Sequence, residues 1–240
     1  MKLQRLTEKI WFYPFEEERD RPNLGYIRGD RWSLAVDAGH SRDHTLAFYR
    51  ELENTGLPLP ALTVLTHWHW DHTFGMHSVH GLCAAEKRTE EHLRRFRERF
   101  AREGRAFFLG LDESIRLEYS EDRPVVITLP DMTFMDNMSL DAGNCPVHVF
   151  HSPGPHTDDS TLIHVPGEKT LFLGDAACGV FPNGEKDAHL AGLLRHTLSL
   201  SGADIFMEGH WHPQSLSEVE ASLPDGIPEP EHTQEEKSCP

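Results

Sequence analysis

No stretch of this 240-residue sequence stays apolar over the ~20 residues that a membrane-spanning helix needs. The segment MKLQRLTEKIWFYPFEEERD, at 1–20, has no apolar core of the kind found in secretory signal peptides, and it turns acidic at once. From these two absences we expect a soluble, cytoplasmic protein.

Cysteine pairs and basic charge are also scarce. The four cysteines are scattered without a C-x-x-C pair, which predicts reduced thiols rather than a disulfide framework. Lys and Arg number 23 against 39 Asp and Glu, for a net charge of −16. Because phosphate binding needs a basic face, this charge argues against nucleic acid or membrane as a partner and favours a small-molecule substrate. The G-x-S-x-G turn of serine hydrolases is missing as well.

Apolar patterning predicts alternating strands and helices. A helix expected at 41–55 separates strands expected at 24–37 and 61–66, and this order implies a parallel pair and hence an α/β sheet. A charged helix is expected at 84–103, with Gly104 as its C-cap. The other expected elements are strands at 9–13, 125–129, 132–135, 147–151, 160–165, 170–173 and 204–207 and helices at 187–200 and 214–222.

We interpret residues 1–223 as a single domain with a helical insertion or lid around 84–120. Residues 86–105 hold eight Lys/Arg against five Glu. This segment is either a lid that attracts an anionic substrate or a solvated helix with Glu–Arg pairs four residues apart. The tail 224–240 has four prolines and no periodic apolar face, which predicts disorder.

Histidine is the residue in excess, with 17 copies. The sequence HWHWDH follows the expected strand 61–66. Alternate residues of an extended segment point the same way, so His67 and His69 can bind one metal ion. A turn into a following helix would bring Asp71 and His72 to a second position. Imidazole nitrogens and carboxylate oxygens are zinc ligands, and the motif therefore predicts a metal site.

This spacing resembles that of the metallo-β-lactamase superfamily of metallohydrolases, and further landmarks follow in the family's order. The turn HSPGPHTDDS matches the family's third histidine at His156, LFLGDAAC supplies Asp175 after an apolar strand, and FMEGHWHP supplies His210. Upstream, VDAG matches an early structural aspartate at Asp37. The landmarks extend from about residue 9 to residue 213.

The resemblance implies a four-layer αβ/βα sandwich of two mixed β-sheets flanked by helices. It also implies a dinuclear metal-dependent hydrolase, with two divalent ions (Zn²⁺, or else Fe or Mn), whose bridging hydroxide attacks a small ester, thioester, lactone or amide. Asp71 would be the catalytic residue that orients the nucleophile. The implied ligands are His67, His69 and His156 for the first metal, Asp71, His72 and His210 for the second, and Asp175 between them.

Three of these ligands have rivals nearby: His212 for His210, His151 for His156, and Asp158 or Asp159 for Asp175. We favour His210 because it follows Gly209 at a strand end, and His156 because His151 lies inside an expected strand. The two loop aspartates are better suited to bonding their own loop. Weaker candidates for substrate contact are Trp68 and Phe74, which interleave the ligands or else belong to the core, and His40 and Tyr13, which the resemblance places in loops bordering the site.

Departures from the family's subgroups leave the substrate open. The cysteine-containing zinc β-lactamases lack a histidine at the position of His72 and have a cysteine at the position of Asp175. The chain therefore resembles the general hydrolases instead. A mononuclear iron persulfide dioxygenase of the same fold is an alternative, because its two-histidine, one-aspartate ligand set is present. A second alternative is a non-catalytic metal-binding protein, against which the seven ligand candidates argue. The sequence predicts no particular oligomeric state.

Overall fold

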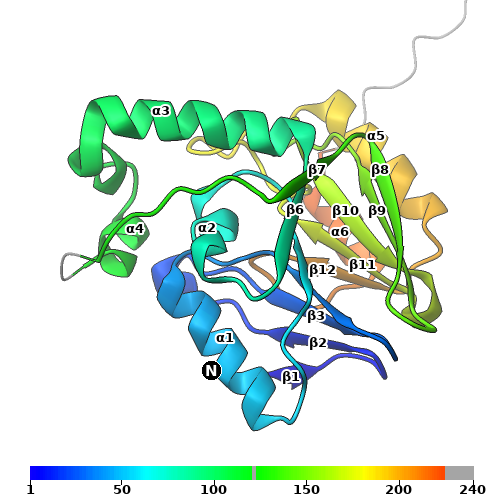
Figure 1. The fold of residues 1–240 in the computed structure, drawn as a ribbon. Coiled ribbons are helices and arrows are strands. Elements are labelled where there is room, and N and C mark those ends of the chain that lie inside the picture. Colours follow the sequence, from blue (N-terminus) through cyan, green and yellow to red (C-terminus); the bar gives the residue numbers. More distant parts are fainter. Residues whose placement is uncertain (121–122, 225–240) are drawn as a thin grey trace, which may run out of the picture.

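Two mixed β-sheets form the centre of the computed structural model, which describes residues 1–120 and 123–224 (Figure 1). In the first sheet β1 to β4 pair antiparallel and β4 to β7 pair parallel. In the second, ordered β12-β11-β10-β9-β8, only β11 and β12 are parallel. The strands are β1 (Gln4–Arg5), β2 (Ile10–Tyr13), β3 (Leu24–Arg28), β4 (Ser33–Val36), β5 (Leu62–Val64), β6 (Leu82–Glu86), β7 (Met132–Phe134), β8 (Asn137–Asp141), β9 (Pro146–His151), β10 (Thr161–Val165), β11 (Thr170–Gly174) and β12 (Ile205–Glu208).

Strand alternation explains the layers. In β2, Ile10 and Phe12 point into the apolar core between the sheets, whereas Trp11 and Tyr13 pack on the opposite face. That outer face is covered by α1 (Arg42–Asn54), whose N-cap is Ser41. The outer face of the second sheet packs against α5 (Ala188–Leu200) and α6 (Leu216–Ser222). The αβ/βα sandwich predicted from the sequence is confirmed.

The helix expected at 84–103 is shifted and extended. Residues 82–86 form β6, an interior strand between β5 and β7, because parallel pairing on both sides outweighs the weak strand propensity of Ala84 and Ala85. The helix α3 (Lys87–Leu109) then continues past a break at Gly104, where φ is 76°. A shorter helix, α4 (Glu113–Glu118), follows. We call residues 87–118 the helical arm.

Two other sequence expectations differ from the structure. Residues 125–129 form no strand, although Val125, Ile127 and Leu129 alternate inward and pack against the apolar cluster beneath the helical arm. Strand β8 was not expected, because NMSLD contains few of the residues that favour strands. It forms by pairing with the strongly apolar β9. The tail predicted at 224–240 lies, from residue 225 on, outside the described residues.

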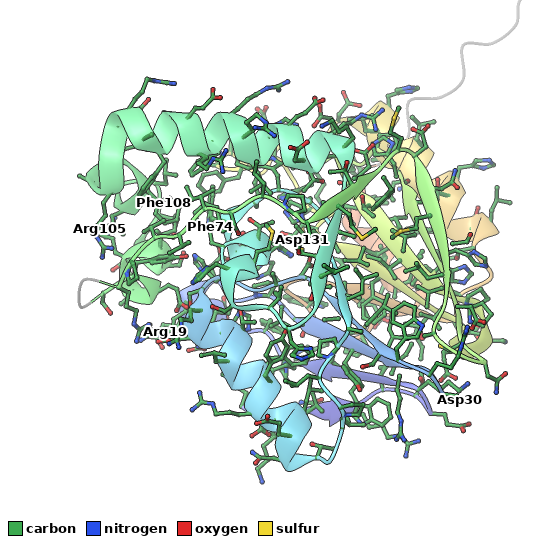
Figure 2. All side chains as sticks on the ribbon, in the orientation of Figure 1. Arg19, Asp30, Phe74, Arg105, Phe108 and Asp131 are labelled. Atoms are coloured by element: carbon green, nitrogen blue, oxygen red, sulfur yellow. The ribbon has the colours of Figure 1, made fainter. Side chains whose placement is uncertain are left out.

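The helical arm covers the histidine-rich motif from outside. Figure 2 shows Phe74, which follows the short helix α2 (Trp70–Thr73), beside Phe108 of α3. Their ring centroids are 5.3 Å apart, and Phe96 of α3 contacts both rings and Trp70. Each fully buried aromatic side chain contributes about 1.5–3 kcal/mol of hydrophobic stabilisation, so this cluster fixes α2 firmly. Within the described residues, no helix is both long and apolar enough to cross a bilayer.

Candidate metal centre

One edge of the two sheets collects the loops that carry the histidine and aspartate side chains. β4 and β5 are parallel neighbours in the first sheet, as are β11 and β12 in the second, so the segments after them emerge together. The residues brought to this edge are His67 and His69 after β5, Asp71 and His72 in α2, His156 between β9 and β10, Asp175 after β11 and His210 after β12.

The first group consists of His67, His69 and His156, whose ligand atoms all lie within 4.8 Å of one another. Nδ1 of His69 is 2.9 Å from Nε2 of His156. Burial, reinforced by neighbouring imidazoles, holds the pKa of His67 well below its usual range and lowers that of His69 to about 3. These two rings are neutral at physiological pH, as metal ligation requires.

The second group consists of Asp71, His72, Asp175 and His210. Oδ2 of Asp71 is 3.1 Å from Nε2 of His72 and 3.0 Å from Nε2 of His210. Burial alone would lower the pKa of both histidines, but the surrounding carboxylates outweigh it. They raise the pKa of His210 to about 9 and that of His72 well above its usual value. The same attraction overcomes burial and holds the pKa of Asp71 and Asp175 well below the usual range.

Asp175 lies between the two groups. Its Oδ2 is 3.7 Å from Nε2 of His156 and 3.6 Å from Nε2 of His210, while its Oδ1 is 3.4 Å from Nε2 of His72. One carboxylate therefore reaches nitrogens of both groups, which is the position that a shared ligand would need.

Asp37 orients this assembly from beneath. Its Oδ2 is 2.8 Å from Nδ1 of His72, and its Oδ1 accepts hydrogen bonds from the amide and hydroxyl of Thr66. A carboxylate that holds the second nitrogen of a histidine fixes which nitrogen faces a metal. Gly209 leaves the space that this packing needs, because a Cβ at that position would lie 2.3 Å from Oδ1 of Asp175.

The donor atoms fit divalent metal ions. Nε2 of His67 is buried and has no hydrogen-bond partner among the described residues, and Nε2 of His72 and Oδ1 of Asp175 are buried with no hydrogen bond beyond their ion-pair contacts of 3.1 and 3.4 Å. Leaving buried polar atoms unpaired costs free energy, so such atoms converging on one point indicate a ligand. Three imidazoles on one side, with imidazoles and carboxylates on the other, form a donor set suited to zinc or a similar metal.

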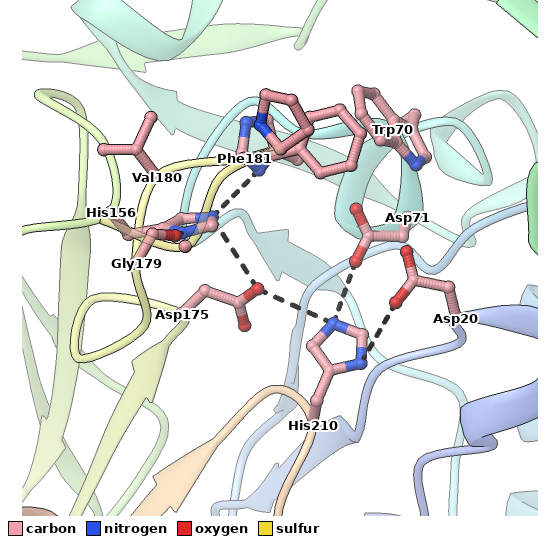
Figure 3. A pocket seen from close by; sticks show the side chains of 12 residues that line it. Asp20, Trp70, Asp71, His156, Asp175, Gly179, Val180, Phe181 and His210 are labelled. Carbon is pink, nitrogen blue, oxygen red and sulfur yellow. Dashed lines mark hydrogen bonds and ion pairs between the residues drawn. The ribbon is translucent and has the colours of Figure 1, made fainter. Parts of the chain in front are cut away.

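A cavity of about 220 Å³ opens onto both groups (Figure 3). The rings of Trp70 and Phe181, with centroids 5.1 Å apart, lie across the cavity from His210. Asp20, from the loop between β2 and β3, lies beside Asp71. Burial and the Asp71 carboxylate raise the pKa of Asp20 to about 7. The lining residues are Asp20, His69, Trp70, Asp71, His156, Asp175, Gly179, Val180, Phe181, Pro182, Gly184 and His210.

All seven side chains expected as ligands lie together, and their sequence rivals do not join them. His212 packs on Phe15, and His151 bonds the carbonyl of Asp158. Asp158 and Asp159 lie together with His92, at a separate cluster on the helical arm.

The four side chains expected at the substrate do not line the cavity. Phe74 and Tyr13 are buried in the core, at 2% and 5% exposure. His40 is fully buried, and its Nδ1 bonds the carbonyl of Arg19. Trp68 stacks on His92 of α3. Their apolar rings stabilise the fold around the motif, which is why their proximity in sequence did not place them at the cavity.

Several lining residues were absent from the sequence-based candidates, among them Asp20 and the residues of the turn 179–184. Phe181 lies in a tight turn closed by hydrogen bonds between Val180 and both Gly184 and Glu185. The bracketing glycines, Gly179 and Gly184, were the available signal for that turn. Asp20 lies within an acidic and basic run, EEERDR, that gives no sign of pocket lining.

Comparison with known proteins gives one family and one fold. A family model described as the metallo-beta-lactamase superfamily matches residues 19–213. Among solved structures, a metallo-beta-lactamase from Pontibacter korlensis is similar with a TM-score of 0.67 and 17% identity, over 92% of this chain and 96% of that one. The DIM-1 metallo-beta-lactamase is similar with a TM-score of 0.65 and 18% identity, over 92% and 95%. No curated protein sequence matched the chain. At these identities the structural likeness concerns the fold.

Proposed function

The chain belongs to the metallo-beta-lactamase superfamily, and from that premise we propose that it is a dinuclear metal-dependent hydrolase of small esters, thioesters, lactones or amides. One observation carries the proposal: seven side chains in two adjoining groups direct nitrogen and carboxylate atoms toward one cavity. A purely structural cluster would have no need to leave buried donor atoms unpaired beside a cavity.

The proposed ligands divide as the two groups do. His67, His69 and His156 would hold the first ion, and Asp71, His72 and His210 the second, with Asp175 shared between them. The donor atoms suit zinc. Two such ions, when bound, would lower the pKa of a water molecule and polarise the scissile carbonyl.

The chain's own residues would orient the reactants. Asp71 is a buried carboxylate whose pKa lies well below its usual range, so it stays ionised and can accept a hydrogen bond from the attacking water. Asp37 holds the His72 ring through Nδ1, at 2.8 Å. Trp70 and Phe181 form an apolar wall that would exclude bulk water from one side of the substrate.

The first experiment is elemental analysis of protein purified without added metal or chelator, with zinc, iron and manganese quantified per chain. About two zinc ions per chain would support the proposal, and a screen of ester, thioester, lactone and amide hydrolysis would follow. If His67→Ala and His210→Ala each remove about one ion, the two groups bind separately. Two-zinc protein that hydrolyses nothing in the screen would contradict the hydrolase.

About one iron per chain would favour the alternative, a mononuclear persulfide dioxygenase, and the assay would become oxygen consumption with thiol persulfides. The presence of the second ligand group argues against this dioxygenase. Asp71, His72 and His210 form a complete set of ligand atoms within 4.8 Å, together with Asp175.

A further inference from the structure

The described lining of the cavity combines aspartates and histidines and contains no Lys or Arg. Three of these lining residues are aspartates. Asp71 and Asp175 belong to the second ligand group, and Asp20 does not. Asp20 contacts His210 but belongs to neither ligand group, so it is the lining carboxylate with hydrogen-bonding capacity left for a substrate.

The Asp20 carboxylate faces the cavity with spare hydrogen-bonding capacity. Its side chain is 40% exposed, and its Oδ1 is 3.6 Å from Nδ1 of His210. In Figure 3 one carboxylate oxygen is directed at His210 and the other away from it. The residue caps a short 3-10 helix (Glu17–Arg19) with φ of 49°, a left-handed conformation that turns the chain sharply at this point.

The two arginines beside Asp20 are occupied elsewhere. Arg21 forms a bidentate pair with Glu118 of α4, at 2.9 and 3.0 Å, and its remaining nitrogen bonds Glu16. Arg19 donates to the carbonyl of Leu117, at 2.7 Å. Because Glu118 is fully buried, leaving its charge unpaired would be costly, so these arginines are not free to bind an anionic substrate.

The opposite wall suits a cation as well. The faces of tryptophan and phenylalanine rings attract positive charge, and Trp70 and Phe181 both line the cavity. A carboxylate-bearing substrate would instead meet Asp20, and no Lys or Arg of the described lining would pair with it.

We propose that Asp20 is a specificity-determining residue that selects substrates with a positively charged nitrogen near the scissile bond. This inference rests on the proposed hydrolase function and narrows its substrate class to small cationic esters or thioesters. Asp20 contacts the charged end of the substrate, while the residues of the two ligand groups act at the reacting carbonyl.

The test uses zinc-loaded protein and three thiols of the same reach: thiocholine, its uncharged isostere 3,3-dimethylbutanethiol, and 3-mercaptopropionate. Thiolates ligate zinc, so thiocholine and its isostere are anchored alike and differ in charge, whereas 3-mercaptopropionate adds a carboxylate that can also ligate zinc. Calorimetry measures their binding, and the acetyl thioester of each thiol serves as substrate. We expect thiocholine to bind about tenfold more tightly than its isostere, and acetylthiocholine to have the highest kcat/KM.

Asp20→Asn keeps the shape of the side chain and removes its charge. We expect it to bring the thiocholine-to-isostere ratio close to one, both in binding and in kcat/KM. Asp204→Asn removes the same charge from an exposed pair with Lys169 and should leave the ratio unchanged. Zinc content is measured for every variant, because Asp20 also faces His210.

The outcomes separate the two proposals. If none of the thioesters is hydrolysed but binding favours thiocholine through Asp20, thioester hydrolysis is excluded from the proposed function and the selection of cations by Asp20 stands. If hydrolysis occurs and Asp20→Asn leaves the ratio as in wild type, the specificity inference is overturned. Should the variant lose zinc, wild-type protein alone decides, because equal or tighter binding of the uncharged isostere would refute the inference.

Discussion

The two ligand groups differ in how they are held before any metal binds. The first contains only imidazoles, and burial keeps His67 and His69 uncharged. The second pairs two carboxylates with two histidines whose pKa values are raised, so it is a network of ion pairs. Asp37 adds a further carboxylate to the second group, at His72.

This difference means that the two groups release different numbers of protons when a metal binds. In the first group, His67 and His69 offer neutral nitrogens and need no proton removed. The second group is assembled by its own charges, but His72 and His210 must each lose a proton before their nitrogens can bind a metal. The neighbouring charges therefore decide whether a histidine in these two adjoining groups is neutral or protonated before a metal binds.

The largest effect is expected for Asp71→Ala, which removes a carboxylate from the second group alone. Turnover should fall by at least about a thousandfold, because both a metal ligand and the group that orients water are lost. Zinc content should fall by about one ion per chain, with the first group still loaded. Asp204→Ala, at an exposed surface pair, is the control. Activity near the wild-type level would refute the two-metal mechanism.

The next effect is the pH dependence of metal binding to metal-free protein. The raised pKa of His210, about 9, and that of His72 mean that both are protonated at neutral pH. Affinity at the second group should therefore rise with pH, by about tenfold per pH unit for each proton displaced. Binding at the first group should depend less on pH, because His67 and His69 are already uncharged. Calorimetry in buffers of different ionisation enthalpy counts the protons released when metal binds. Equal proton release at both groups would contradict the predicted difference between them.

A smaller effect should follow from Asp37→Asn, which weakens the hold on His72 without touching a ligand of the first group. Metal affinity at the second group should fall by about 10–100-fold, as is typical when a residue that orients a ligand is changed. Asp131→Asn provides a matched control, since that carboxylate also accepts a backbone hydrogen bond but lies at Cys83. An equal loss of affinity at both groups would show that Asp37 acts through the fold instead.

The smallest effect concerns the loop that carries His156. The Thr89 hydroxyl of α3 donates to Oδ2 of Asp159 at 2.8 Å, and both residues are fully buried. Thr89→Val should lower the free energy of unfolding by about 1–3 kcal/mol and weaken metal binding at the first group only. Chemical denaturation and metal titration measure the two effects. Thr197→Val, whose hydroxyl bonds only within α5, should change neither by a comparable amount.

The sequence could predict the parts of the site that depend on local geometry. His67, His69, Asp71 and His72 follow from a strand that runs into a turn, because their spacing alone sets their directions. His156, Asp175 and His210 are isolated in sequence and were found through the family's order of landmarks.

Asp20 could not be predicted in either way. Its position depends on Arg21 reaching Glu118, a residue 97 positions away. The interior strand β6 was mistaken for the start of a helix for a similar reason, since only its neighbours β5 and β7 make Ala84 and Ala85 extended. Contacts between distant segments decide both cases, and no local pattern encodes them.

The buried Glu118 at the end of α4 links the helical arm to the wall of the cavity. It binds Arg21 on the Asp20 loop and also accepts a hydrogen bond from Ser41 at the start of α1. Sequence change in α4 near Glu118 can thus shift the Asp20 loop, whereas the part of the arm that packs on α2 also supports the ligands. Related proteins with this fold could therefore change their substrate specificity through substitutions in a peripheral helix, while the metal ligands stay the same.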